Sequence, residues 1–366
     1  MSIQTGYIRD KRQSDFISLE TDQAELEVLF QAVPLRDHLV QFGFEYHLMK
    51  LAASKPFEQG VKILKGCNAD HLVSGFFWDT VEFDGGRWIL SLGSKMEYLE
   101  DIGFELSPSA RLLFKADENN VFWGAASRTI RTPSYTERFV RMPVTVEQPF
   151  EYLIRYSLVG NPKLREEDAR SLEIGYRLLL PAGFMFDASV FYTRYQGLSD
   201  AAQVEEPVWV NDILEVDMLF DNLGRGTVRG GELALTWDVA SWLRLHAWYS
   251  YCKGTYRQFS TRTFFASQYG HINPDHQYFL RSSFTLPLDI ELDLLARHVS
   301  KLRGVGMPAY TELDARLGFR PGKNIELSLV GKNLLKAEHT EAANYLFYGA
   351  PAMLERSVAF EIRMNF

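Results

Sequence analysis

The chain has no long apolar run. It has 366 residues, 46% of them hydrophobic, yet no stretch approaches the roughly 18 uncharged apolar residues that a membrane-spanning helix needs. The sequence therefore excludes helical membrane spans. It does not exclude a transmembrane β-barrel, because barrel strands carry apolar residues only at every second position. The slightly negative mean hydropathy of -0.16 fits such a pattern.

Cysteine is also scarce, and the charge balance is negative. The two cysteines, Cys67 and Cys252, are too few for a disulfide framework and lack the close Cys/His spacing of a zinc site. Whether they pair stays open. With a net charge of -8 and no run rich in Lys or Arg, no nucleic-acid partner is expected. Residues Met1 to Asp10 lack the apolar core of a secretory signal, so an exported protein with this sequence would lack its beginning.

Catalytic motifs are missing as well. The sequence has no Gly-x-Ser-x-Gly elbow, no His-Glu-x-x-His pair and no Walker-type phosphate loop. The run Gly224-Arg225-Gly226-Thr227 does not have the spacing of a dinucleotide-binding turn. We therefore expect no enzymatic activity, no catalytic residue, no cofactor and no metal site.

Strict alternation of apolar and polar residues is the strongest positive signal. In the closing segment Ser357 to Phe366, the residues Val358, Phe360, Ile362, Met364 and Phe366 are apolar, and most of those between them are polar. This period of two predicts a strand with one apolar face, and ten residues suffice for a tilted strand to cross a bilayer. Similar alternation occurs around Leu313 to Phe319, Val40 to Tyr46 and Leu233 to Trp237. Helical spacing is not sustained anywhere.

Turn-forming residues fall into two alternating size classes. The short turns are expected at Pro34 to Asp37, Asp84 to Gly86, Asp117 to Asn120, Pro181 to Gly183, Asp238 to Ser241, Pro287 with Leu288, and Pro321 to Lys323. The long connections are expected at about Asp10 to Asp22, Leu48 to Asp70, Glu100 to Leu106, Thr129 to Ala169, Gln196 to Thr227, Thr255 to Pro274, Ser300 to Gly306, and Leu335 to Met353. This order predicts about 16 antiparallel strands, with both chain termini on the short-turn side, as in outer-membrane barrels. A soluble all-β sandwich or propeller is the alternative fold.

Several stretches also match a known family pattern. They are Trp123 to Ser134, Gly160 to Leu164 with Glu166, Ser171 to Arg177, the set Asn222, Gly224, Gly230, Gly231 and Glu232, and Val330 to Leu335. With the terminal Phe366, they resemble the C-terminal half or more of TonB-dependent outer-membrane receptors. Such receptors import ferric siderophores, haem or cobalamin. The resemblance covers about Gly75 to Phe366.

The resemblance implies one partial barrel domain over residues 1–366, part of a receptor barrel of about 22 strands. The signal peptide, the short motif that binds the energising protein (the TonB box) and the plug domain are not recognisable. This suggests truncation from the N-terminal side, through a split gene, a misplaced start or a shortened expression product. It also implies the outer membrane of a Gram-negative bacterium as location. The expected partners are outer-membrane lipid, the barrel assembly machinery and a ferric-siderophore-like ligand of the complete receptor, with an inner-membrane energy-coupling protein acting only through the missing plug.

Ligand contacts are expected in the outer loops, above all between Thr129 and Ala169. The candidates are arginines and tyrosines suited to an anionic or catechol-like ligand, with one histidine: Arg131, Tyr135, Arg138, Arg141, Tyr152, Arg155, Tyr156 and His271. His276 and His339 also lie in or beside outer loops. The alternative is that these residues belong to an ordinary solvent-exposed loop without a binding role. The closing strand, with Val358, Phe360, Ile362, Met364 and Phe366, is expected to guide membrane assembly.

Two functions remain open from the sequence. One is a nutrient uptake receptor, of which this chain would be a C-terminal barrel fragment that does not transport actively alone. The other is a stand-alone passive channel of 16 strands, because porins of about 16 to 18 strands enclose an aqueous lumen. The transported ligand, and whether 16 strands close on their own, stay open.

Overall fold

The computed structural model describes residues 1–13, 18–53, 62–64, 69–147, 152–181, 183–258, 273–322, 324–344 and 349–365. His271 and Phe366, which the sequence singled out, and Cys67 lie outside the described residues. No helix in these ranges is long and apolar enough to cross a bilayer.

Strands make up nearly all of the described chain. Their bounds are β1 (Ser2–Gln13), β2 (Ser18–Ala32), β3 (His38–Ala53), β4 (Lys62–Ile63), β5 (Ala69–Phe83), β6 (Trp88–Leu99), β7 (Gly103–Lys115), β8 (Asn120–Arg131), β9 (Val140–Glu147), β10 (Leu153–Val159), β11 (Glu167–Leu180), β12 (Phe184–Gln203), β13 (Val208–Val210), β14 (Ile213–Ala240), β15 (Leu243–Gln258), β16 (His276–Leu286), β17 (Ile290–Val299), β18 (Tyr310–Gly322), β19 (Ile325–Lys332), β20 (Glu338–Asn344), β21 (Gly349–Glu355) and β22 (Ser357–Met364). The described helices are α1 (Tyr135–Phe139) and a 3-10 turn at Arg303–Val305. The expectation of an all-β chain with almost no helix is confirmed.

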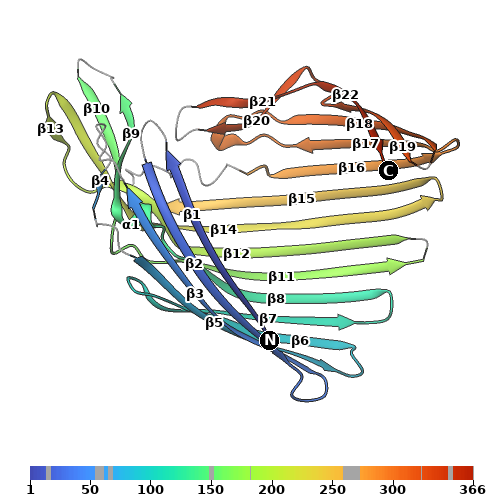
Figure 1. The fold of residues 1–366 in the computed structure, drawn as a ribbon, viewed down its shortest axis with the longest axis horizontal. Coiled ribbons are helices and arrows are strands. Elements are labelled where there is room, and N and C mark those ends of the chain that lie inside the picture. The colour runs from blue at the N-terminus through green and yellow to red at the C-terminus, as the bar shows by residue number, and fades with distance from the viewer. Residues whose placement is uncertain are drawn as a thin grey trace.

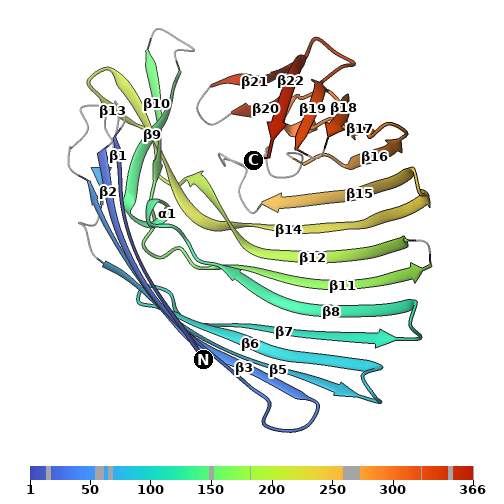
Figure 2. The ribbon, with the colours of Figure 1, turned by 45° about the vertical axis from the view of Figure 1, so that its right-hand side comes forward.

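Twenty of the described strands belong to one sheet, and β20 and β21 form a separate hairpin. Four of the twenty, β4, β9, β10 and β13, lie in the long connections; each of the other sixteen pairs antiparallel with the next, from β1 through to β22. This meander confirms the predicted number of strands. Figure 2 shows that it curls into an incomplete barrel.

The short connections lie together at one end of the barrel (Figure 1). Short and long connections alternate over much of the chain, but two connections predicted to be long are not. Glu100 to Leu106 contains only a three-residue turn between β6 and β7, and most of Asp10 to Asp22 is strand, because β1 reaches Gln13 and β2 begins at Ser18. Three short turns contain non-glycine residues with positive φ: Asp37 at 70°, Asp84 at 53°, and the pair Leu288 and Asp289 at 65° and 56°. Such backbone fits tight hairpins whose twist matches that of the strands. Ser2 and Met364 both lie on the short-turn side. Ser2 pairs with Leu29, near the turn at Pro34 to Asp37, and Met364 pairs with Ile325, which begins β19 after another short turn.

One face of the meander carries large exposed apolar side chains, among them Phe77, Leu112, Phe122, Leu172, Ile174 and Val190. Five aromatic rings form a row near the short-turn end of this outward face: Phe83, Trp88, Phe114, Phe122 and Tyr176. They come from five neighbouring strands, and the centroids of successive rings are 4.2 to 6.4 Å apart. Aromatic girdles of this kind mark the membrane interface in transmembrane barrels. We call these five residues the aromatic row.

The opposite face carries paired charges. Arg281 and Asp293 contact at 2.9 Å across β16 and β17, and Arg316 reaches Glu291 on β17 at 3.3 Å and Glu326 on β19. These pairs alternate with outward apolar residues, so they lie on the inner face. On this inner face, charges of opposite sign therefore pair across neighbouring strands.

The expectation about the long stretch between β12 and β14 was wrong as well. Residues Gln196 to Thr227 were expected to form a long outer loop, but β12 continues to Gln203 and β14 begins at Ile213, so most of this segment is strand. The alternation of period two is interrupted there by a bulge at Gly197, which hid the strands.

Candidate ligand-binding lobe and its polar joint

The long connections on one side of the barrel build an ordered domain that we call the outer lobe. It consists of α1, β9, β10, β13, the connection of residues 160–166, and the loop-side ends of β12 and β14, residues 199–203 and 213–222. Figure 1 shows these elements beyond the ends of the wall strands. Here β10 runs parallel to β14 and antiparallel to β9, the one parallel pairing among the described strands.

The lobe contains its own hydrophobic core. Leu158, Leu164, Ala201, Val216, Met218 and Phe220 are buried against one another, and Val144, Ile154 and Tyr156 pack on them. Among the described residues these side chains form one cluster of buried apolar residues, and all its members lie in the lobe. The lobe is therefore a folded unit rather than a solvated loop.

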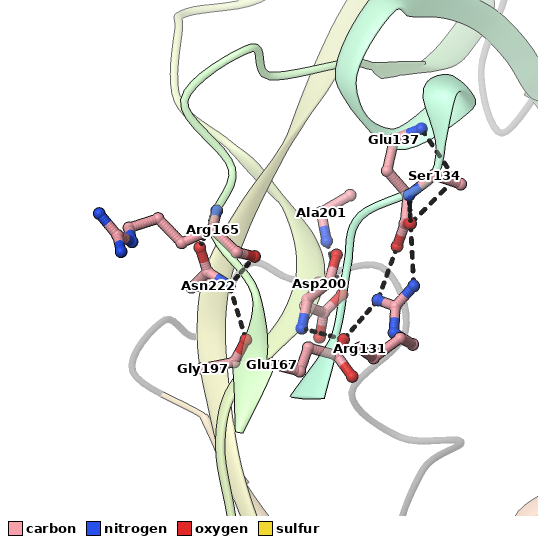
Figure 3. A network of polar contacts seen from close by, with 10 residues as sticks. Arg131, Ser134, Glu137, Arg165, Glu167, Gly197, Asp200, Ala201 and Asn222 are labelled. Atoms are coloured by element: carbon pink, nitrogen blue, oxygen red, sulfur yellow. Dashed lines mark hydrogen bonds and ion pairs between the residues drawn. The ribbon is translucent and has the colours of Figure 1, made fainter. Parts of the chain in front are cut away.

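A network of polar contacts joins the lobe to the wall (Figure 3). Arg131, the last residue of β8, contacts Glu137 at 2.9 Å and Glu167 at 2.5 Å. Glu137 in turn accepts the backbone N–H of Ser134, while the Ser134 hydroxyl caps α1 by accepting the N–H of Glu137. Glu167 also accepts the backbone N–H of Ser199 at 2.9 Å. Together these contacts tie β8, α1, β11 and β12 together.

Asn222 holds the other half of this joint. Its amide donates to the backbone oxygens of Arg165 and Gly197 at 3.0 and 2.6 Å, and its carbonyl oxygen accepts the Arg165 N–H. Gly197 has a φ of 64°, and a Cβ there would meet the Glu166 carbonyl oxygen at 3.3 Å. A glycine is thus required at the bulge, where the backbone passes close to the returning connection.

The network unites segments that are far apart in the sequence. Arg131 and Ser134, the stretch from Gly160 to Glu166, and Asn222 were singled out separately as family-like motifs, and the structure brings all three to one place. We call this network, with Glu137, Glu167 and Gly197, the polar joint. Glu137 and Glu167 were not identified from the sequence. The Ser134-x-x-Glu137 spacing of a capping box was a local signal for Glu137, whereas nothing local marks Glu167, whose partner Arg131 is 36 residues away.

Three further candidate arginines are also engaged by carboxylates. Arg138 contacts Asp70 and Asp101, each at 2.9 Å, and its side chain is only 4% exposed. Arg141 contacts Glu215 at 2.6 Å and Asp217 at 2.7 Å, and Arg155 shares Glu215 at 3.0 Å. Burial lowers the pKa of Arg141, but the hydrogen bonds from Asp217 and Glu215 outweigh it and raise the pKa. These ion pairs hold the lobe in shape and fix it to the wall.

The aromatic candidates divide into buried and exposed. Tyr135 is buried and packs on Phe139 with ring centroids 5.2 Å apart, and Tyr156 packs on the lobe core. Tyr152 instead lies edge-on to Trp209 at 4.9 Å, and Trp209 on β13 is 57% exposed. Trp209 was missed because it lies in the segment read as a featureless loop. Its signal was an isolated Val-Trp-Val run between Pro207 and Asn211.

Two of the candidate histidines, His276 and His339, lie in the described ranges, and neighbouring side chains hold both. His276 contacts the Tyr249 hydroxyl at 2.9 Å, and the buried His339 stacks on Tyr310 and contacts Glu341 at 3.1 Å. His339, Glu341 and Glu312 have ligand atoms within 4.8 Å of one another, as in a cation site. Arg297 already pairs with both carboxylates, so this cluster docks the β20–β21 hairpin on the wall.

An outward apolar face with an aromatic row, an inward charged face and a folded lobe at the long-loop end define a transmembrane barrel of the outer-membrane type. The chain belongs to the family described as TonB dependent receptor-like, beta-barrel, whose model matches residues 5–334. The family and the strand architecture place it in the outer membrane.

Similar proteins are receptors and transporters. The chain is 24% identical over 190 residues to the catecholate siderophore receptor Fiu of Escherichia coli K12, covering 49% of this chain and 23% of Fiu. It is 25% identical over 249 residues to the heme/hemopexin utilization protein C of Haemophilus influenzae, covering 65% and 35%. The chain thus spans about a quarter to a third of the length of these relatives.

Solved structures show the same fold. The ferric enterobactin receptor PfeA of Pseudomonas aeruginosa superposes with a TM-score of 0.71 at 15% identity, over 96% of this chain and 54% of that one. The FrpB iron transporter of Neisseria meningitidis gives a TM-score of 0.70 at 12% identity, over 96% and 56%. At these identities the likeness concerns the fold alone.

Proposed function

We propose that this chain supplies barrel wall and outer lobe to an uptake receptor for an iron-carrying ligand with aromatic rings, such as a ferric catecholate or haem. The main support is the outer lobe, which is an ordered unit with its own hydrophobic core and an exposed aromatic tip. It lies on the long-loop side of a barrel of the TonB-dependent receptor family. Loops held on a rigid scaffold are where such proteins place binding groups.

The tip of the lobe offers the first contact. Trp209 is flanked by the exposed Val208 and Val210, and Tyr152 lies edge-on to its ring. Flat rings stack on exposed aromatic side chains, and such pairs contribute about 0.5–1.5 kcal/mol beyond the area they bury. The names of Fiu and PfeA (catecholate, ferric enterobactin) and of the Haemophilus protein (heme) fit ligands with such rings.

The arginine candidates support this role indirectly. Because Arg131, Arg138, Arg141 and Arg155 contact carboxylates of the lobe and wall, we assign them to holding the lobe in shape. Arg165, at the polar joint, also contacts a carboxylate, Glu166 at 3.4 Å, but at 66% it has the most exposed side chain of the arginines in this region. A negatively charged ferric complex would meet it below the aromatic tip.

Titration of the full chain in detergent with ferric enterobactin or haemin, followed by tryptophan fluorescence, tests the proposal. We expect saturable quenching, and for Trp209→Ala an affinity lower by about tenfold, the upper end of an aromatic stacking contribution. Trp242→Ala is the matched control, since Trp242 is similarly exposed but lies in the short turn between β14 and β15. Equal affinities of the two variants, or no saturable binding, would contradict the proposal.

We further propose that the sixteen strands are part of a larger wall and do not drive active import by themselves. Among the described residues, β1 pairs only with β2 and β22 only with β19, so each has an edge without a strand partner. The match to 54% of the PfeA structure supports the same view. The complete receptor would then need an inner-membrane energy-coupling partner as well.

The passive channel stays the second candidate, because sixteen strands match the number in porins. Planar-bilayer conductance separates the two. A stable open pore formed by this chain alone would favour the channel, whereas the receptor proposal expects no steady conductance.

A further inference from the structure

Three arginines lie side by side on the outward face of the wall. In the strand register, Arg170 on β11 is directly opposite both Arg128 on β8 and Arg194 on β12. Like charges directly opposite each other destabilise a sheet. Such a row therefore needs an anion to stabilise it.

The protein supplies only part of that negative charge. Asp168 contacts Arg128 and, at 3.0 Å, Arg170, and Glu105 contacts Arg128 at 3.0 Å. Arg194 is exposed and has no carboxylate partner within the described ranges. The Arg170 side chain is 64% exposed despite its contact with Asp168. Three guanidinium groups thus share two carboxylates, and the row keeps an excess of positive charge.

The row faces the same side as the apolar residues of the wall. Side chains two residues apart in a strand share a face. Next to the row along β11 and β12, this face carries exposed apolar and aromatic side chains: Leu172, Ile174, Val190 and Tyr192. No register shift interrupts β8, β11 and β12 between the row and these residues. An arginine at the edge of a lipid-facing surface is costly unless its charge reaches water or an anionic headgroup.

A groove runs from this row toward the aromatic row. A hollow of about 620 Å³ is lined by all three arginines together with Ala110, Ala126 and Leu172. A second hollow of about 620 Å³ shares Ala110, Ala126 and Leu172 and extends to Phe114 and Phe122 of the aromatic row. Gly124 and the two alanines keep the floor low on β7 and β8, so an acyl chain can lie between the larger side chains.

We propose that this groove binds a phosphorylated membrane lipid with several acyl chains, its phosphate on Arg170 and Arg194 and a chain along Ala110, Gly124 and Ala126. The charge decides the occupant, since a neutral lipid would leave Arg194 unpaired. The aromatic row fixes the direction, with phosphate toward the long loops and acyl chain toward the short turns. This site is separate from the lobe and does not depend on the ligand taken up there.

Lipid retention tests the proposal. The purified full chain is equilibrated in mixed micelles with diphosphoryl lipid A or with its dephosphorylated form, and the lipid that stays bound through gel filtration is quantified by mass spectrometry. We expect about fivefold less retention of the dephosphorylated lipid, the effect of about one lost arginine contact. This comparison uses the unmodified protein and so does not depend on any variant folding.

Variants then locate the site. Arg194→Gln and Ala126→Leu, which fills the groove, should each lower retention of the phosphorylated lipid, by about fivefold for the lost charge. Arg303→Gln is the control, because Arg303 is likewise exposed on the long-loop side but lies between β17 and β18. A heat-dependent shift in electrophoretic mobility verifies the barrel in each variant.

Three results would overturn the proposal. They are equal retention of both lipids, equal retention by Arg194→Gln and Arg303→Gln, and complete displacement of the lipid by inorganic phosphate at the concentration of the lipid. The last would show a simple anion site without a contribution from the groove.

Discussion

The wall and the outer lobe place their apolar side chains in opposite directions. In the wall, residues such as Ile174 point outward and are 63% exposed, while charges pair on the inner face. In the lobe, Leu164 and Phe220 point inward to a small core, and charged pairs surround it. One chain therefore contains a unit built for lipid and a unit built for water, and the polar joint is where they meet.

The largest expected effect tests that difference directly. Ile174→Arg puts a charge on the lipid face and should cost about 2–4 kcal/mol of folding free energy in a bilayer. Val208→Arg in the lobe, where Val208 is 59% exposed, should change it by less than about 0.5 kcal/mol. Urea titrations of both variants in lipid vesicles measure the difference. Similar costs at the two positions would mean that the wall face does not meet lipid.

The second prediction concerns the buried cation of the lobe. Arg138→Met leaves Asp70 and Asp101 without their common partner and should loosen the lobe by about 3 kcal/mol, near the lower end for a broken buried ion pair. Limited proteolysis should then cut the lobe while the wall stays protected. Arg177→Met is the control, because Arg177 pairs with Asp187 in the wall and is 52% exposed, which predicts less than about 1 kcal/mol. Equal protease resistance of the two variants would refute the assignment.

The wall could be predicted from the sequence and most of the lobe could not, for a physical reason. Alternation in Ser357 to Met364 and turn residues such as Asp84 to Gly86 are local signals, and many wall strands pair with the next strand across a short turn, as β5 does with β6. The lobe depends on distant contacts, such as Arg138 with Asp70 at 68 residues' separation and β10 beside β14 in parallel. Residue types there pointed to ligand contacts, whereas the structure shows that most of the arginines contact carboxylates of the same chain.

Acid should loosen the polar joint. Burial raises the pKa of Glu137, but the hydrogen bonds from Arg131 and Ser134 outweigh it and place the pKa below the ordinary 4.5. The carboxylate thus contributes stability above pH 4.5, and this contribution, about 1 kcal/mol for a helix cap, is lost as the pH falls through the lowered value.

Hydrogen exchange at the Asn161 amide, which donates to the Glu137 backbone oxygen at 2.9 Å, reports on this loss. The protection factor of this amide is compared between the unmodified protein and Glu137→Gln at each pH, which removes the intrinsic effect of pH on exchange. In Glu137→Gln the protection factor should not change as the pH falls. Parallel protection curves for the two proteins would show that Glu137 does not control the joint.

The smallest effect sharpens the comparison within the wall itself. The Tyr176 hydroxyl in the aromatic row donates to the Asn120 side chain at 2.6 Å, close to the short-turn end. Tyr176→Phe keeps the ring contact with Phe122 and removes only that hydrogen bond, so the unfolding free energy should fall by about 0.5–1.5 kcal/mol. Tyr192 is an exposed outward tyrosine with no hydrogen-bond partner in the described ranges. For Tyr192→Phe the unfolding free energy should therefore fall by less than about 0.5 kcal/mol. Denaturant titration in vesicles resolves such a gap, and identical values would mean that the aromatic row is held by ring packing alone.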